Sequence, residues 1–146
     1  MSFDLFRNSK ITMSTSAPYF DADVAPYFEH AEVNGADGEW RARQEGAGFA
    51  LELTLRQASD PWNTTGWPQY KWRVELRVDG RSVLHARNPP QYLMMRKSLL
   101  LTIADAWRKA ASADLEDAKN ILIRELRARE QSPEPYIVLK YKHQLP

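Results

Sequence analysis

The stretch that decides the fold is YKWRVELRV at residues 70–78, which is followed by Asp79 and Gly80. Apolar residues stand at every second position of this stretch, and lysine, arginine and glutamate fill the positions between them. Such alternation predicts a β-strand with one buried face and one solvated face. An Asp-Gly pair directly after a strand is typical of a β-hairpin, so the chain is expected to turn back into a second strand.

The length of the turn decides the register of this hairpin. A two-residue turn over residues 79–80 places Leu84 on the charged face. A three-residue loop over residues 78–80, with Gly80 in the left-handed conformation, pairs Val74 with Leu84 on the apolar face. Because a shift of one residue moves every side chain to the opposite face, burial favours the three-residue loop.

Three further stretches alternate in the same way. Residues 38–43 and 49–56 precede the hairpin, and residues 136–142 come near the end of the chain. Each is predicted to be a strand whose apolar side chains share one face of a sheet. The earlier two, together with the hairpin, form an antiparallel meander of about four strands, and the last stretch returns to the sheet.

Helical periodicity occupies the chain between the hairpin and the last strand. Asn88 is predicted to cap a helix that has proline at its first position and ends near residue 111. Ser112 or Asp114 caps a second helix over residues 115–130. Apolar residues recur at spacings of three and four in both segments, so each helix has one apolar face.

Strands followed by helices, rather than a regular alternation of the two, predict the α+β class. In this fold the two helices pack on one face of the sheet, and the opposite face is solvated and rich in arginine. Residues 1–16 are polar without a clear period and are predicted to be a flexible N-terminal arm. Residues 17–146 are predicted to form a single α+β domain, since a chain of 146 residues has the usual length of one domain.

Composition excludes several classes of protein. The chain has no cysteine, 43% hydrophobic residues and 27% charged residues, which excludes a disulfide-rich scaffold and a wholly disordered chain. No apolar run approaches the ~18 residues of a membrane span, so no membrane association is predicted. Without cysteine and without a recognisable secretory signal, the cytoplasm is the expected compartment.

The small net charge of +1 covers two unlike halves of the chain. Residues 1–66 carry ten acidic and five basic side chains, whereas residues 67–146 carry nine acidic and fifteen basic ones. Such asymmetry is typical of a chain with an interaction surface, although the same charges also suit an ordinary solvated surface.

Motifs of the common enzyme classes are absent from the sequence. It contains no phosphate-binding loop, no dinucleotide-binding turn and no Gly-x-Ser-x-Gly elbow. His30, His85 and His143 are far apart and lack metal-ligand spacing, and no cysteine is present to serve as a nucleophile or a metal ligand. The sequence therefore predicts a non-enzymatic protein with no metal and no cofactor, with a motif-free active site as an alternative.

The leading prediction is a protein-binding adaptor or inhibitor that acts by occlusion of its partner. Interfaces are enriched in tryptophan, tyrosine and arginine, and Trp62 and Trp67 in one loop are the expected apolar anchors. The acidic contacts are expected from the front of the chain, at Asp21, Asp23, Glu29 and Glu32.

The alternative prediction is binding of single-stranded RNA or DNA. Basic side chains interleaved along the hairpin form one cationic strip, and the two tryptophans close by offer stacking platforms for unpaired bases. Binding of this kind is expected to weaken strongly with salt. The cationic contacts of this prediction are Lys71, Arg73, Arg77, Arg81 and Arg87. Of these, Arg73 and Arg77 are also the cationic contacts expected for a protein partner.

Overall fold

The structure is a computed structural model, and it describes residues 22–36, 39–57, 70–89, 97–130 and 137–141. The predicted arm over residues 1–16 lies outside these ranges. The described elements are a 3-10 helix, six strands and two α-helices. In chain order they are η1 (Ala25–Phe28), β1 (Glu32–Ala36), β2 (Glu39–Glu45), β3 (Ala50–Gln57), β4 (Tyr70–Val78), β5 (Arg81–Arg87), α2 (Lys97–Ala111), α3 (Leu115–Glu130) and β6 (Val138–Tyr141).

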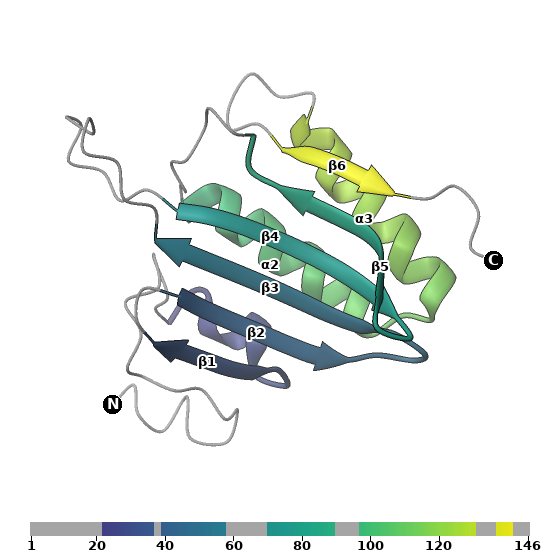
Figure 1. The fold of residues 1–146 in the computed structure, drawn as a ribbon, viewed down its shortest axis with the longest axis horizontal. Coiled ribbons are helices and arrows are strands. Elements are labelled where there is room, and N and C mark those ends of the chain that lie inside the picture. The colour runs from purple at the N-terminus through teal and green to yellow at the C-terminus, as the bar shows by residue number, and fades with distance from the viewer. Residues whose placement is uncertain (1–21, 37–38, 58–69, 90–96, 131–136, 142–146) are drawn as a thin grey trace.

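All the described strands belong to one sheet. Their order is β1-β2-β3-β4-β5-β6, and every neighbouring pair is antiparallel. Figure 1 shows the strands side by side in the order of the chain, with the helices on the far side. The predicted α+β class is therefore confirmed.

The sheet has six strands rather than the predicted meander of about four with one final strand. The additional strand is β1, which pairs with β2 along its whole length. The sequence did not predict it because the strand has only five residues and contains Asn34-Gly35, a pair more typical of a tight turn.

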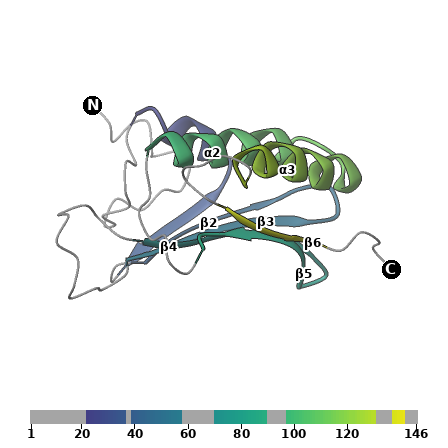
Figure 2. The same cartoon turned by 90° about the horizontal axis from the view of Figure 1, so that it is seen from above.

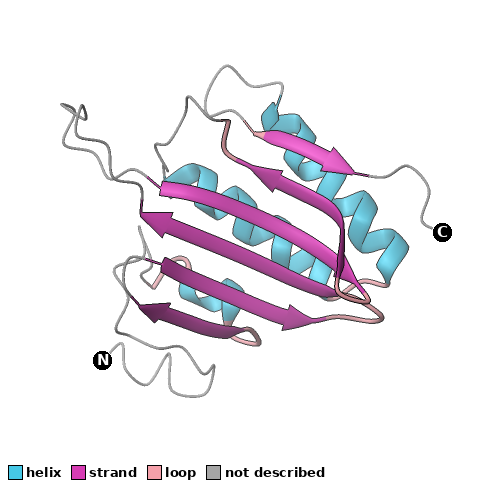
Figure 3. Cartoon of the chain, in the orientation of Figure 1, coloured by secondary structure: helices cyan, strands magenta, loops and turns pink. Residues whose placement is uncertain are grey.

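The helices cover one face of the sheet. In Figure 2, α2 and α3 lie on the same side of the strands with η1 beside α2, and Figure 3 shows both long helices behind the strands. Phe28 of η1 lies 5.6 Å from Trp40 of β2 and 5.4 Å from Trp107 of α2, measured between ring centroids, so the three rings join the layers. None of the described helices combines the length and apolarity needed to cross a membrane.

The turn between β4 and β5 differs from the predicted three-residue loop. Val78 pairs with Arg81, so only Asp79 and Gly80 form the turn. Both have positive φ angles, 51° and 77°, which is the backbone conformation that matches the twist of two hairpin strands. The left-handed Gly80 was predicted correctly, but the length of the loop was not.

A β-bulge restores the phase of the hairpin after this two-residue turn. Val83 is an extra residue on β5, so the register shifts by one and Leu76 pairs with Leu84. The predicted pair of Val74 with Leu84 is therefore wrong, yet Leu84 remains on the buried face. Burial decides which side chains of β5 face the helices, as expected. The bulge, and not the length of the turn, brings them to that face.

The described part of the first helix is α2, and its predicted start falls outside the described residues. Asn88 and Pro89 lie outside any helix, and α2 begins at Lys97, with residues 90–96 outside the described ranges. The Asn88 side chain accepts a hydrogen bond from the Trp72 backbone N–H at 3.0 Å, and it donates one to the Pro89 carbonyl at 3.1 Å. The amide of Asn88 is thus bonded to the sheet, and the start of the helix that it was predicted to cap lies outside the described ranges.

Helix α3 has the predicted bounds, and the structure chooses between its two predicted caps. The Asp114 carboxylate accepts a hydrogen bond from the Asp117 backbone N–H at 2.8 Å, which is the geometry of an N-cap. The Ser112 hydroxyl instead donates to the Arg108 carbonyl in the last turn of α2, at 3.2 Å.

Candidate functional site

The described helices leave one face of the sheet uncovered (Figure 2). Along β4, Trp72 and Val74 are buried under the helices, whereas Lys71 and Arg73 are exposed on the opposite face. Arg77 on the same strand is half-buried. The predicted alternation is therefore confirmed, and Lys71 and Arg73 are available to solvent.

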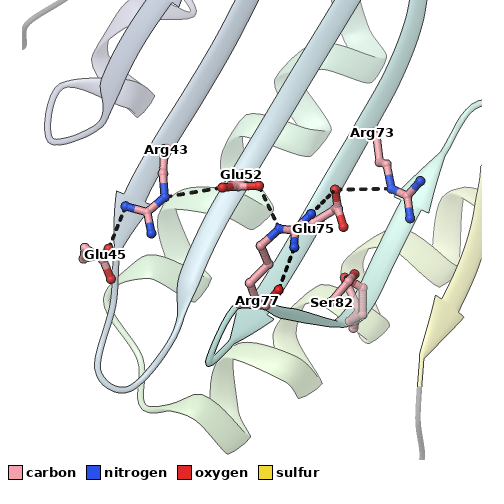
Figure 4. Close-up of polar contacts among 9 residues, drawn as sticks. Arg43, Glu45, Glu52, Arg73, Glu75, Arg77 and Ser82 are labelled. Carbon is pink, nitrogen blue, oxygen red and sulfur yellow. Dashed lines mark hydrogen bonds and ion pairs between the residues drawn. The ribbon is translucent and has the colours of Figure 1, made fainter.

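At the hairpin end of this exposed face, acidic and basic side chains form a connected network (Figure 4). Glu52 and Glu75 face each other on β3 and β4, and Arg77 contacts both carboxylates, at 2.9 and 3.3 Å. Arg43 reaches Glu52 from one side at 3.3 Å, and Arg73 reaches Glu75 from the other at 3.4 Å. We call these five residues the Arg–Glu network.

Opposite charges in the Arg–Glu network compensate each other. The Glu75 carboxylate raises the pKa of Arg77, and the hydrogen bond to Glu52 adds to the rise, while burial opposes it. Likewise, a hydrogen bond of 2.6 Å to Glu45 raises the pKa of Arg43. The charges of these two arginines are therefore compensated by carboxylates of the protein itself.

The other end of the exposed face is hollow and basic. A concavity of about 570 Å³ opens there, where β2 and β4 begin and β3 and β5 end. Among the described residues around it, five side chains are cationic and one is acidic, and we call this site the basic concavity. Its lining residues are Glu39, Arg41, Thr54, Arg56, Lys71, Trp72, Arg73, Arg87 and Asn88.

Strand register brings like charges together in the basic concavity. Arg56 lies opposite Lys71, and Arg73 lies opposite Arg87. Side chains opposed in this way have Cβ atoms about 5 Å apart, and like charges there destabilise the sheet. Glu75 reaches Arg73, but no carboxylate among the described residues forms an ion pair with the other three.

The remaining polar groups of the basic concavity do not cancel its charge. Glu39, the one acidic side chain among its described lining residues, is paired with Arg41 at 2.6 Å. The guanidinium of Arg87 donates to the backbone carbonyl of Asn88 at 3.1 Å, so a neutral group orients it. The basic concavity therefore has excess positive charge, and its cations stand on the strands of the sheet.

His85 lies between the two ends of the exposed face. It faces Glu75 on β4 and Lys140 on β6. Partial burial lowers the pKa of the His85 imidazole, and the charges of Arg73, Arg87 and Lys140 lower it further, while Glu75 opposes them. His85 therefore adds no positive charge to the site at neutral pH.

Two of the predicted basic residues lie outside the basic concavity. Arg77 belongs to the Arg–Glu network at the hairpin end of the face. Arg81 is exposed, but it pairs with Val78. Val78 is in phase with the apolar side chains of β4, so Arg81 does not belong to the charged face. The three predicted residues that the structure does bring together are Lys71, Arg73 and Arg87.

The predicted acidic residues do not form a single patch in the structure. Asp23 pairs with Lys97 at the start of α2, at 2.7 Å, and Glu29 follows η1, so both belong to the helical side. Glu32 is exposed on β1, opposite Arg43 on the sheet.

Three of the predicted site residues lie outside the described ranges, namely Asp21, Trp62 and Trp67. Within the described ranges, no group of three histidine, cysteine, aspartate or glutamate side chains is placed to hold a metal ion.

Sequence reasoning did not include Arg41 and Arg56 among the site residues. A signal for them was present, because both occupy the solvated positions of alternating strands. What the sequence lacked was the register between strands, which alone places Arg56 opposite Lys71.

Comparison with known proteins adds no identification, since the chain matches no protein-family model, no curated protein and no solved structure. Fold and site together define a two-layer α+β protein with an open sheet face that is basic at one end.

Proposed function

We propose that this protein is a non-enzymatic binding protein that holds a polyanionic macromolecule on the exposed face of its sheet and acts by occluding it. The observation that carries the proposal is the basic concavity, in which two pairs of like charges face each other on neighbouring strands. Such pairs destabilise a sheet, and a bound anion removes the repulsion between them.

The contrast between the two ends of the exposed face supports this proposal. Glu52 and Glu75 are also like charges in opposed positions, but Arg77 bridges them at 2.9 and 3.3 Å. Arg56 and Lys71, in the equivalent positions nearer the other end, have no such bridge among the described residues. The fold compensates its acidic pair and leaves the basic pair open to solvent.

The chemistry of arginine also favours an anionic ligand. Its planar guanidinium presents parallel N–H donors that match the oxygens of a carboxylate or a phosphate. Four of the five cations in the basic concavity are arginines, and all five stand on strands of the sheet. That the chain is not an enzyme and acts in the cytoplasm remain predictions from its sequence.

An acidic protein surface is the second candidate ligand, since carboxylates pair with arginine as phosphates do. The aromatic anchors expected for a protein partner, Trp62 and Trp67, lie outside the described residues. Asp23, one of its expected acidic contacts, is paired with Lys97 within the chain. The described residues therefore support a protein partner only through the basic concavity.

The proposal is tested by retention on immobilised heparin, a sequence-free polyanion, at neutral pH. The net charge of +1 gives little general attraction, so retention must come from a local cluster. We expect the Lys71→Glu, Arg87→Glu double variant to elute at clearly lower salt than the natural protein.

The matched control is the Arg81→Glu, Arg124→Glu double variant, which changes the net charge equally at exposed positions away from the basic concavity. It should elute close to the natural protein. Equal losses in both double variants, or passage of the natural protein through the column, would contradict the proposal. Circular dichroism and thermal unfolding confirm that each variant is folded.

A further inference from the structure

The two cation pairs of the basic concavity have a defined spacing. Lys71 and Arg73 are two residues apart on β4, with the intervening side chain buried, so they stand about 7 Å apart along the strand. Arg56 flanks Lys71 from β3, and Arg87 flanks Arg73 from β5. The concavity thus offers two seats for anions, each made of two cations. Because the seats are also offset by one strand spacing, their midpoints lie about 8 Å apart, a step that long, flexible cationic side chains can match to successive phosphates of a nucleic-acid strand.

We infer that the ligand of the basic concavity is the backbone of a single-stranded nucleic acid, with successive phosphates in the two seats and no base contact from the described residues of the sheet face. This inference rests on the proposed function and names its ligand. The first seat is Arg56 with Lys71, and the second is Arg73 with Arg87.

A phosphodiester fits a two-cation seat better than a carboxylate does. The two oxygens of a carboxylate lie in one plane and are satisfied by a single bidentate arginine. The two free oxygens of a phosphodiester point to different sides, so each accepts hydrogen bonds from a separate cation. Opposed cations on neighbouring strands supply such donors from two sides.

The exposed face of the described sheet presents no aromatic side chain. Trp72 lines the basic concavity, but its side chain is buried and belongs to the face covered by the helices. Strand register places no phenylalanine, tyrosine or tryptophan side chain on this face among the described residues. Protein interfaces have aromatic anchors at their centres, and base-binding sheets stack bases on aromatic rings. The described residues of this face can therefore bind a nucleic acid through its phosphates, and such contacts do not depend on base sequence.

The size of the basic concavity favours a single strand over a duplex. Its volume of about 570 Å³ lies in the range of sites that hold one small ligand, which suits a short stretch of one backbone. The Arg–Glu network bounds the basic part of the face toward the hairpin, where acidic side chains repel further phosphates.

The experiment measures fluorescence anisotropy of labelled 12-mers at several salt concentrations. The probes are single-stranded DNA of mixed sequence, oligothymidylate, the corresponding duplex and a poly-glutamate peptide. Two phosphates in two seats give an expected slope of log affinity against log salt of about −1.4, at −0.7 for each phosphate of a single strand. Mixed-sequence DNA and oligothymidylate should bind alike, within about threefold.

The Arg56→Gln, Lys71→Gln double variant empties the first seat. We expect it to lower the salt slope to about −0.7 and the affinity about eightfold at 0.05 M salt, because one phosphate contact is lost. The Arg81→Gln, Arg124→Gln double variant removes the same charge elsewhere on the surface and should change neither value. Thermal unfolding checks that both variants are folded.

Each other outcome overturns the inference in a distinguishable way. Tighter binding of poly-glutamate than of single-stranded DNA would exclude the nucleic acid and leave the proposed function intact. A preference for the duplex, or for one base sequence, would exclude a single-stranded backbone held by phosphates alone. If no probe binds and heparin retention also fails, both the inference and the proposed function are wrong.

Discussion

At the scale of single residues, His85 links the charge of the exposed face to pH. Its ordinary pKa is 6.5, and partial burial together with the charges of Arg73, Arg87 and Lys140 lowers the pKa in the folded protein. The unfolded chain therefore binds a proton at His85 more readily than the folded protein does. Stability that depends on this residue is present above pH 6.5 and is lost as pH falls through the lowered pKa.

We expect the free energy of unfolding of the natural protein to fall more between pH 7.5 and pH 5 than that of His85→Gln. The variant cannot take up the proton, and carboxylates that titrate in this range do so in both proteins. Urea unfolding at a series of pH values measures the difference. Parallel stability curves for the two proteins would show that His85 titrates alike in the folded and unfolded states.

Gly46 illustrates a residue whose identity is fixed by one neighbour. A Cβ atom at this position would lie 2.3 Å from Cζ of Phe49, whose ring is buried. Gly46→Ala should therefore displace the ring and destabilise the protein by about 1–3 kcal/mol, as overpacking does.

In a Phe49→Leu background, the same Gly46→Ala substitution should cost less, because the clashing ring is gone. Urea unfolding of the four proteins in this double-mutant cycle gives the coupling between the two sites. An equal cost in both backgrounds would locate the effect of Gly46 in the backbone rather than in contact with the ring.

At the scale of elements, the start of α3 depends on a single carboxylate. Asp114 accepts the Asp117 backbone N–H at 2.8 Å, so Asp114→Ala should lower the free energy of unfolding by about 1 kcal/mol. Ser112→Ala is the matched control, because its hydroxyl bonds only within the last turn of α2. Its effect should stay within about 0.5 kcal/mol, and the reverse order in urea unfolding would assign the cap to Ser112.

Elements with a strong period were predictable from sequence, and those without one were not. β4 and α3 have the predicted bounds because their apolar residues recur without interruption over nine and sixteen residues. β1 was missed because pairing with β2, not its own sequence, makes it a strand. The bulge at Val83 depends on the fit of turn to sheet, which no single segment encodes.

The sequence predicted on which face of the sheet the candidate site lies, but not which residues come together in it. Alternation along one strand places Lys71 and Arg73 on the solvated face. Their neighbours Arg56 and Arg87 come from two other strands, and the pairing follows from registers set by whole hairpins. Charge compensation by the Arg–Glu network depends on those same registers.

At the scale of the whole molecule, the two faces of the sheet have different roles. One is packed against the helices and supplies the stability of the fold. The other holds opposed cations at its basic end, where only Arg73 of the four forms an ion pair with a carboxylate of the described residues. A binding site that destabilises the free protein is a common cost of function.

Lys71→Gln should therefore stabilise the free protein while weakening its binding of polyanions. Removal of one charge from the opposed Arg56–Lys71 pair should raise the free energy of unfolding by about 0.2–1 kcal/mol at low salt. In 0.5 M salt the gain should shrink, because exposed charges are screened. Urea unfolding at both salt concentrations measures it, and a loss of stability at low salt would mean that the Lys71 charge is already compensated.

The order of elements along the chain has a consequence for synthesis on the ribosome. Strands β1–β5 all precede residue 97, so their apolar face is complete before either covering helix has been made. At about 5–20 residues per second, translation of residues 97–130 takes about 2–7 s. During that interval the strands emerge from the exit tunnel without their helical cover, and the rate of elongation through the helical segment determines how long their apolar side chains stay exposed.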